Sequence, residues 1–256
     1  MSGFSLNSVS DLSLEALDAG IYFDVEMREA DTLPALVGVM IDGEFEIIVL
    51  EELLHPAAEY SSLRVREPLS LFENLLLQAE RDDCHLIAYS QHEFDLLASM
   101  FSNGSPKHEH LLDILNRRYF NANIRKWFRK NLRESYDLLE SKEKAKGKSS
   151  KFAKNSGGIR MGLKLLLQLP EVAYPDVKSA GIGYPATTLR QVRDHLQRKE
   201  PSIDSLTPGV KRKWSKLLTY NRHDVVGMEH LLRFAVESEH RLKDMKGAQT
   251  HSSQRR

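Results

Sequence analysis

Two carboxylates interrupt an apolar run near the start of the chain, and this feature constrains the fold more than any other. Residues 21–27 read IYFDVEM, and aromatic and β-branched residues of this kind favour a buried strand. Side chains alternate along a strand, so Asp24 and Glu26 share one face, whereas Phe23 and Val25 share the other. A buried carboxylate is costly unless it is paired or binds a cation. The fold must therefore supply positive charge on one side of this strand.

The D-x-E pair permits two interpretations. Carboxylate oxygens are the ligands that hard divalent cations prefer, so a pair on one face predicts a metal site. An arginine from a neighbouring element would compensate the same charge by an ion pair. The D-x-E pattern is common, and this stretch alone leaves both interpretations open.

The order of the predicted elements favours an α/β fold with a mixed β-sheet flanked by helices and a helix-rich C-terminal half. Asp42-Gly43 lies between two of the expected strands and is typical of an antiparallel hairpin turn. Apolar periodicity predicts strands at 20–27, 35–41, 44–50 and 84–90. The predicted helices span 68–81, 92–101, 108–118, 121–138, 160–168, 187–199 and 208 to about 240.

These elements predict one domain at residues 20–240, which follows an N-terminal extension at 1–19. The segment 141–158, SKEKAKGKSSKFAKNSGG, is rich in Lys, Ser and Gly and poor in apolar residues, so we expect a mobile basic loop. Residues 241–256 are expected to form a disordered tail.

Charge is distributed unevenly along the 256 residues, although 36 basic and 36 acidic side chains balance overall. Residues 1–113 hold 22 acidic and 5 basic residues, whereas the remainder holds 14 acidic and 31 basic residues. The segment 117–154 alone has 13 Lys and Arg against 4 Asp and Glu. One side of such a molecule can attract a polyanion such as nucleic acid. A solvated helix and a charged loop would explain the same run of charge.

Three features predict a cytoplasmic protein with no membrane contact. Cys84 is the only cysteine, which excludes an intrachain disulfide framework and fits a reducing compartment. The first twenty residues lack the basic start and apolar centre of a signal peptide. No apolar run approaches the roughly 18 residues that a membrane span needs.

Two later stretches of the sequence favour a metal site at the Asp24 and Glu26 pair. Residues 88–95, AYSQHEFD, leave a buried strand and bring Asp95 to the start of a helix. Residues 220–224, YNRHD, lie in the long C-terminal helix, where Tyr220 and Asp224 are four residues apart and share a face. A surface aspartate with a tyrosine packed beneath it would explain YNRHD equally well.

The motifs FDVE, AYSQHEFD and YNRHD, in this order, resemble the three exonuclease motifs of the ribonuclease-H-like DEDD superfamily in its tyrosine branch, DEDDy. The similarity is greatest to its YprB-like or RecB-like predicted nucleases. Residues 161–175, MGLKLLLQLPEVAYP, are also similar to the segment that this subgroup carries between its second and third motifs. The resemblance covers about residues 20–236.

The resemblance implies a ribonuclease-H-like fold and a metal-dependent 3′–5′ exonuclease that hydrolyses phosphodiester bonds of DNA or RNA. Asp24, Glu26, Asp95 and Asp224 would bind two divalent cations, Mg²⁺ or Mn²⁺. Tyr220 would orient the attacking water. Two cations about 3.5–4 Å apart can serve the nucleophile and the leaving oxygen of an in-line displacement at once.

The expected substrate contacts come from a serine and a basic helix. The subgroup usually has Asn where this chain has Ser90, a shorter side chain near the substrate strand. The basic segment would hold the phosphate backbone, with single-stranded 3′ ends as the expected substrate, through residues Arg125, Lys126, Arg129 and Lys130.

Other functions stay open at this point. The domain could be a non-catalytic module that binds nucleic acid or protein, or a structure-specific endonuclease that uses the same site. His223 is a further candidate base, although one residue along a helix turns its side chain away from Asp224. Trp127 and Trp214 could stack on bases, but packing against the core is the expected use of both.

Overall fold

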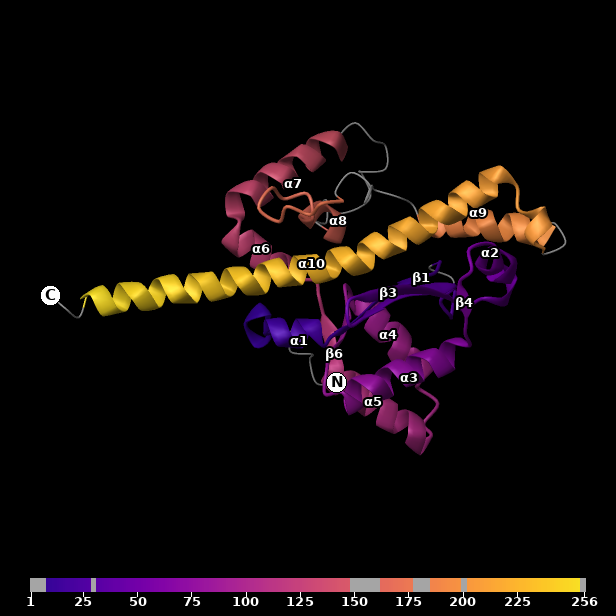
Figure 1. Ribbon diagram of the computed structural model, residues 1–256, viewed down its shortest axis with the longest axis horizontal. Coiled ribbons are helices and arrows are strands. Elements are labelled where there is room, and N and C mark those ends of the chain that lie inside the picture. The colour runs from indigo at the N-terminus through magenta and orange to yellow at the C-terminus, as the bar shows by residue number, and fades with distance from the viewer. Residues whose placement is uncertain (1–7, 29–30, 148–161, 177–184, 199–201, 254–256) are drawn as a thin grey trace.

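The structure, a computed structural model, describes residues 8–28, 31–147, 162–176, 185–198 and 202–253. The fold is α/β, as the sequence predicts: a six-stranded mixed sheet is flanked by helices on both faces, and the C-terminal half is rich in helix. Figure 1 shows α3, α4 and α5 on one side of the sheet and α10 on the other.

The sheet has the ribonuclease-H-like arrangement, with strand order β4-β3-β2-β1-β5-β6. β1, β2 and β3 are antiparallel, whereas β5 pairs in parallel with β1, β6 with β5 and β4 with β3. The strands are β1 Ile21–Glu26, β2 Leu36–Ile41, β3 Glu44–Val49, β4 Arg64–Val65, β5 Leu86–Ala88 and β6 Tyr119–Asn121.

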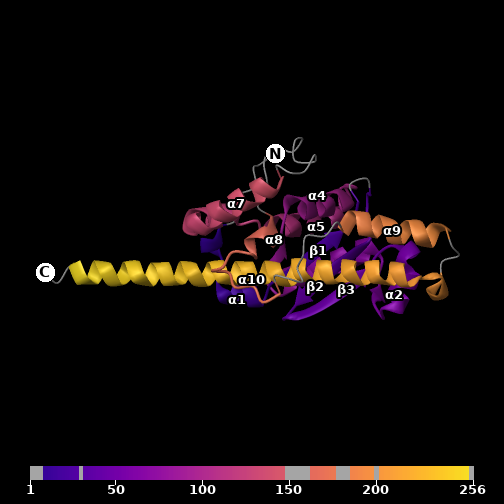
Figure 2. The same cartoon turned by 90° about the horizontal axis from the view of Figure 1, so that it is seen from above.

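Helices cover both faces of the sheet and α10 runs along its length (Figure 2). The α-helices are α1 Leu14–Asp18, α2 His55–Tyr60, α3 Pro68–Arg81, α4 Gln91–Met100, α5 Pro106–Arg118, α6 Arg125–Asn131, α7 Arg133–Gly147, α8 Leu163–Leu166, α9 Pro185–Arg198 and α10 Pro208–Ser253. Short 3₁₀ helices are η1 Val9–Asp11, η2 Glu52–Leu54 and η4 Ile203–Ser205.

The alternation along β1 decides which helices meet which side chains. Phe23 and Val25 are buried in the core that the sheet forms with α3, α4 and α5, and the Phe23 ring contacts Phe72 of α3. Tyr22 points to the opposite side, into the core that contains residues of α10. Asp24 and Glu26 lie on that same side, so the predicted separation of the two faces is confirmed.

Local signals fix several elements as expected. Asp42 and Gly43 have φ angles of 53° and 76°, the left-handed conformations of the predicted hairpin turn. Pro68 begins α3 because its missing N–H costs nothing at a helix start, and the side chain of Glu67 caps the first turn by accepting from the Leu69 and Ser70 amides.

The predicted single helix at 121–138 is wrong. Residues Tyr119–Asn121 form strand β6, which pairs with Leu86–Ala88 of β5. Helix α6 then ends at Asn131, and Leu132, whose φ of −123° and ψ of 46° are not helical, separates it from α7. Pairing with the edge of β5 outweighs the helical pattern here. The pairing gives hydrogen-bond partners to the backbone N–H and C=O groups of this segment and buries Phe120.

The expected domain limits also differ from the structure. The N-terminal extension contributes buried Val9, Leu12 and Leu17 to the core beside α10. Helix α7 includes residues 141–147 of the expected basic loop, and the rest of that loop up to 158 lies outside the described residues.

Helix α10 continues to Ser253 and extends past the sheet (Figure 1), so residues 241–253 of the expected disordered tail are helical, and 254–256 lie outside the described residues. Leu, Lys, Met, Ala and Gln in this stretch are strong helix formers, so local preference favours continuation of the helix. Although α10 is long, none of the described helices is both long and apolar enough to cross a membrane.

Candidate metal centre

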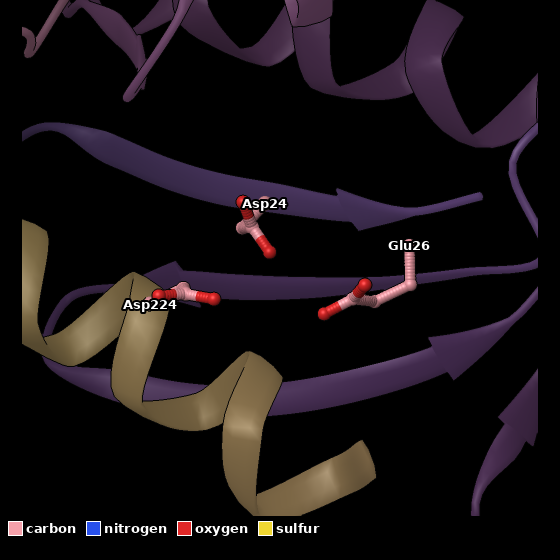
Figure 3. A group of neighbouring side chains, drawn as sticks. All are labelled: Asp24, Glu26 and Asp224. Atoms are coloured by element: carbon pink, nitrogen blue, oxygen red, sulfur yellow. The ribbon is translucent and has the colours of Figure 1, made fainter. Parts of the chain in front are cut away.

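Three carboxylates converge where α10 crosses β1. Asp24 and Glu26 project from β1 and Asp224 from α10, and one oxygen of each lies within 4.8 Å of the others. Figure 3 shows the three side chains directed toward a common space between the strand and the helix. Asp24 and Asp224 lie 200 positions apart in the chain, and the packing of α10 on the sheet brings them together.

Asn221 on α10 holds the first of these acids in place. Its Nδ2 donates to the backbone oxygen of Asp24 at 3.0 Å and to Oδ2 of Asp24 at 2.9 Å. The side chain is fully buried, and it has room because Gly38 lies opposite Asp24 in the β1–β2 register. A Cβ at position 38 would overlap Asn221 Oδ1. Gly38 on β2 therefore leaves the space that Asn221 needs to hold the Asp24 carboxylate on β1.

Burial without full pairing raises the pKa of all three acids. Burial raises the pKa of Asp24 well above its usual value, and the charges of Asp224 and Glu26 add to the effect. Burial and the charge of Asp224 raise the pKa of Glu26 to about 8. Burial raises the pKa of Asp224 to about 7, against the opposing influence of Lys164. Such a site favours neutralisation by a proton or by a cation.

Glu26 supplies a second indication that the cluster has a ligand. Only 4% of the residue is exposed, and within the described part of the chain its Oε1 has no hydrogen-bond partner. An unsatisfied buried carboxylate oxygen costs free energy that a bound cation would recover. Three converging oxygen donors fit a hard divalent cation such as Mg²⁺ or Mn²⁺.

Tyr220 and Lys164 complete one wall of the site. Tyr220 lies one helical turn before Asp224 on α10, and burial together with the three carboxylates raises the pKa of its phenol, which stays a hydrogen-bond donor at neutral pH. The Lys164 ammonium, on α8, lies 3.5 Å from Oδ2 of Asp224 and over the Tyr220 ring. Among the described residues, Lys164 is the only one whose charged group lies within ion-pair distance of Asp224.

Asp95 does not join the cluster, which corrects its prediction as a fourth ligand. The residue is exposed and accepts a hydrogen bond from the Gln91 side chain at 3.1 Å. Glu93 faces the site instead, since it is buried and lines the same cleft as Asp24 and Asp224. Two positions along a helix turn a side chain by about 200°, so residues 93 and 95 cannot face the same side.

The carboxylate of Glu93 is already used in the first turn of α4. Its Oε2 accepts from the Ser90 hydroxyl at 2.6 Å and from the Ser90 amide at 3.1 Å, in a capping box. Ser90 Oγ in turn accepts from the His92 amide. The predicted substrate residue Ser90 therefore lies at the site, but its hydroxyl serves the helix cap.

A cleft of ≈ 370 Å³ opens onto these groups. Its walls carry acidic, aromatic and aliphatic side chains, and Gly162 before α8 leaves one side of it open. The lining residues are Asp24, Tyr89, Ser90, Glu93, Gly162, Leu163, Lys164, Leu165, Tyr220 and Asp224.

A larger cavity of ≈ 580 Å³ near the start of β1 has a different character. Two of its acids, Asp18 and Glu229, are both paired with Arg233 at 2.5 and 2.7 Å. Its charges are thus compensated within the protein, unlike those of the carboxylate cluster.

The predicted phosphate-binding residues lie on α6. Lys126, Arg129 and Lys130 are exposed, and Arg125 is partly buried near Tyr89: burial raises the pKa of the Tyr89 phenol, and the charge of Arg125 opposes that rise. No acid among the described residues lies within ion-pair distance of any of the four. Tyr89 also lines the cleft, so Arg125 neighbours a residue of the cleft wall.

The expected packing roles of the two tryptophans are confirmed, and His223 is engaged elsewhere than at Asp224. Trp127 Nε1 donates to Glu239 at 2.7 Å and its ring contacts Phe234, so α6 docks on α10 through this side chain. Trp214 is buried and donates to Ser61. His223 pairs with the Tyr174 hydroxyl at 3.0 Å, away from Asp224.

The sequence patterns assign no role to Asn221, Glu93 or Lys164, the three residues that surround the acids. Asn221 directly follows Tyr220 in YNRHD, and Lys164 lies in the segment that resembles the nuclease subgroup, so both belong to motifs that could have drawn attention to them. Comparison with protein-family models, curated proteins and solved structures finds no match to this chain.

Proposed function

We propose that this protein is a metal-dependent nuclease that hydrolyses phosphodiester bonds of DNA or RNA. The observation that carries the proposal is the convergence of Asp24, Glu26 and Asp224 around an unpartnered, buried Glu26 oxygen. A protein without a cation to bind gains nothing from burying three acids together. The 3′–5′ exonuclease mode and the preference for single-stranded 3′ ends come from the motif resemblance.

Different residues of this chain would bind the cation and orient the attacking water. Asp24, Glu26 and Asp224 would hold the cation, and Asn221 keeps Asp24 in place. A bound Mg²⁺ or Mn²⁺ supplies positive charge for the phosphate and lowers the pKa of a coordinated water. The protonated phenol of Tyr220, which faces the same carboxylates, orients the attacking water by donating or accepting a hydrogen bond.

The reaction itself is a simple hydrolysis. A bond forms between the water oxygen and phosphorus, and the bond from phosphorus to the 3′ oxygen of the leaving strand breaks. The water loses one proton and the leaving oxygen gains one, so a nucleoside 5′-monophosphate and a 3′-hydroxyl end result. The four basic residues of α6 would hold the strand by its phosphates without reading its sequence.

The resemblance implies two cations on four acids. With Asp95 exposed and Glu93 engaged by Ser90, three carboxylates converge on one point and each offers an oxygen to a cation. These three suit one tightly held divalent cation. The buried, free thiol of Cys84 fits the reducing cytoplasm that we also propose as the location.

The decisive experiment is cleavage of end-labelled single- and double-stranded DNA and RNA in Mn²⁺, Mg²⁺ or EDTA. We expect a ladder that shortens from the 3′ end with either metal, no cleavage in EDTA, and none by an Asp224→Asn variant. If the wild type binds Mn²⁺ but cleaves none of these substrates, the protein is a binding module on the same fold. An internal product of discrete length would instead identify an endonuclease.

A further inference from the structure

Lys164 is positioned as part of the acidic site and not as part of the protein surface. Its side chain is only 12% exposed, and its ammonium group lies 3.5 Å from Oδ2 of Asp224. Long basic side chains normally keep their charged end in water. Burying this one beside three acids has a cost that an ordinary surface lysine does not carry.

Most of the hydrogen-bonding capacity of this ammonium group is unused among the described residues. Within the described residues, Lys164 Nζ is buried and has no hydrogen-bond partner. An ammonium group carries three donors, and the distance to Asp224 is too long to satisfy one well. Lys164 is one of the residues that line the cleft, so its side chain is adjacent to a ligand with several acceptor oxygens that enters there.

The backbone that carries Lys164 is held firmly against α10. Leu163, Leu165 and Leu166 on either side of it are buried, so α8 is anchored by its apolar face. The next residue, Leu167, packs against Gly227 of α10, where a Cβ would overlap it. Gly227 lies one turn beyond Asp224, so the same helix fixes both the acid and the lysine.

The charges at the site leave little room for a second divalent cation. Asp24, Glu26 and Asp224 together carry three negative charges, which one divalent cation with the Lys164 ammonium balances, and the nearby Glu93 carboxylate is held by Ser90 in the cap of α4. A second divalent cation would have to enter beside the ammonium group, and like charges at a few ångströms repel strongly in a partly buried site. The lysine and a second cation therefore compete for one place.

We propose that Lys164 takes the place of a second cation and binds a non-bridging oxygen of the scissile phosphate. This inference rests on the proposed nuclease function and gives the site one divalent cation and one lysine. A lysine binds phosphate as a compact point charge. Its N–H donors that lack a partner among the described residues, and its position beside the carboxylates, suit a phosphate oxygen that the cation does not coordinate.

The test combines cation binding with cleavage. Calorimetric titration of wild type with Mn²⁺ is expected to give one tight site, and Lys164→Met is expected to keep that site with equal or tighter affinity, because a competing charge has gone. Cleavage by Lys164→Met should fall by about a hundredfold or more, the usual loss for one group that stabilises a transition state. Lys164→Arg should recover part of the activity.

Lys107→Met is the matched control, because this lysine is exposed on α5 and pairs with Glu73. It should change neither titration nor cleavage. Two tight Mn²⁺ sites in the wild type, or full cleavage by Lys164→Met, would overturn the inference. Weakened Mn²⁺ binding by Lys164→Met would overturn it too, since the lysine would then only shape the site. No Mn²⁺ binding by any variant would instead refute the proposed nuclease function itself.

Discussion

Gly38 on β2 is the register partner of Asp24 on β1, and the missing side chain of the glycine leaves the space in which Asn221 reaches the aspartate. Neighbouring strands thus contribute a carboxylate and the space for the amide that holds it. The relationship allows the carboxylate cluster to be tested without altering a carboxylate.

Gly38→Ala should displace Asn221 and release Asp24. A Cβ at this position overlaps Asn221 Oδ1, and the fully buried amide has little space to move. We expect a loss of about 1–3 kcal/mol in the free energy of unfolding, as for other overpacked sites, and weaker Mn²⁺ binding by calorimetry. Gly209→Ala is the control, since its Cβ would meet only Thr207 Oγ1 at 4.0 Å. Unchanged Mn²⁺ affinity in Gly38→Ala would show that Asn221 does not position Asp24.

Stability without divalent cations should fall as the pH rises. The pKa of Glu26 is raised to about 8 and that of Asp224 to about 7, whereas unfolded chains titrate near 4. The folded state therefore binds more protons than the unfolded state between about pH 4 and pH 8, and its stability is lost across that window. Each unit of pKa difference corresponds to about 1.4 kcal/mol, so a loss on the order of a few kcal/mol is expected.

Urea unfolding in EDTA from pH 5 to pH 8.5 measures this effect. Glu26→Gln should flatten the profile, because the amide is neutral at every pH, and millimolar Mn²⁺ should raise stability most at the alkaline end. A wild-type stability that rises with pH over this range would contradict the raised pKa values.

Tyr220→Phe should slow cleavage and leave cation binding intact. The phenol faces the carboxylates without ligating them in our proposal, so its loss affects the transition state alone. A hydrogen bond to a charged group contributes about 1.5–3 kcal/mol, which corresponds to roughly a tenfold to hundredfold loss in kcat. KM and the Mn²⁺ titration should match the wild type. Equal kcat for both proteins would remove the tyrosine from the mechanism.

Helix α6 should account for much of the salt dependence of substrate binding. Replacing its four basic residues with Ala should make the slope of log affinity against log salt shallower by about 0.7 for each single-strand phosphate that the variant no longer neutralises. The variant is best made in an Asp224→Ala background, so that binding is measured without cleavage. The four residues are Arg125, Lys126, Arg129 and Lys130.

A control variant that loses the same number of positive charges elsewhere distinguishes phosphate binding by α6 from the electrostatic attraction of the whole protein. Its four exposed side chains lie on β4, α3, α5 and the turn after β4, away from α6. If this control lowers the slope as much as the α6 variant, α6 binds no phosphate specifically. The four control positions are Arg64, Arg66, Arg81 and Lys107.

Local pattern predicts four of the six strands and helices α3, α4 and α5, but not α1, α2, β4 or β6. The alternation in IYFDVEM, the Asp42-Gly43 turn and the Pro68 helix start each act over a few residues, and each element forms where it is expected. Local pattern does not predict the strand at residues 119–121, because this strand forms only by pairing with β5. A three-residue strand carries too little periodicity to be recognised without that partner.

The sequence by itself determined that Asp24 and Glu26 share a face, and that Asp224 and Tyr220 share another. Periodicity along one strand or one helix is enough for both statements. Only the tertiary structure decided that Glu93, rather than Asp95, turns toward the site and that Lys164 lies beside Asp224. These placements depend on how α4 and α8 are rotated against α10 and the sheet, and packing between distant segments sets that rotation, which no local pattern records.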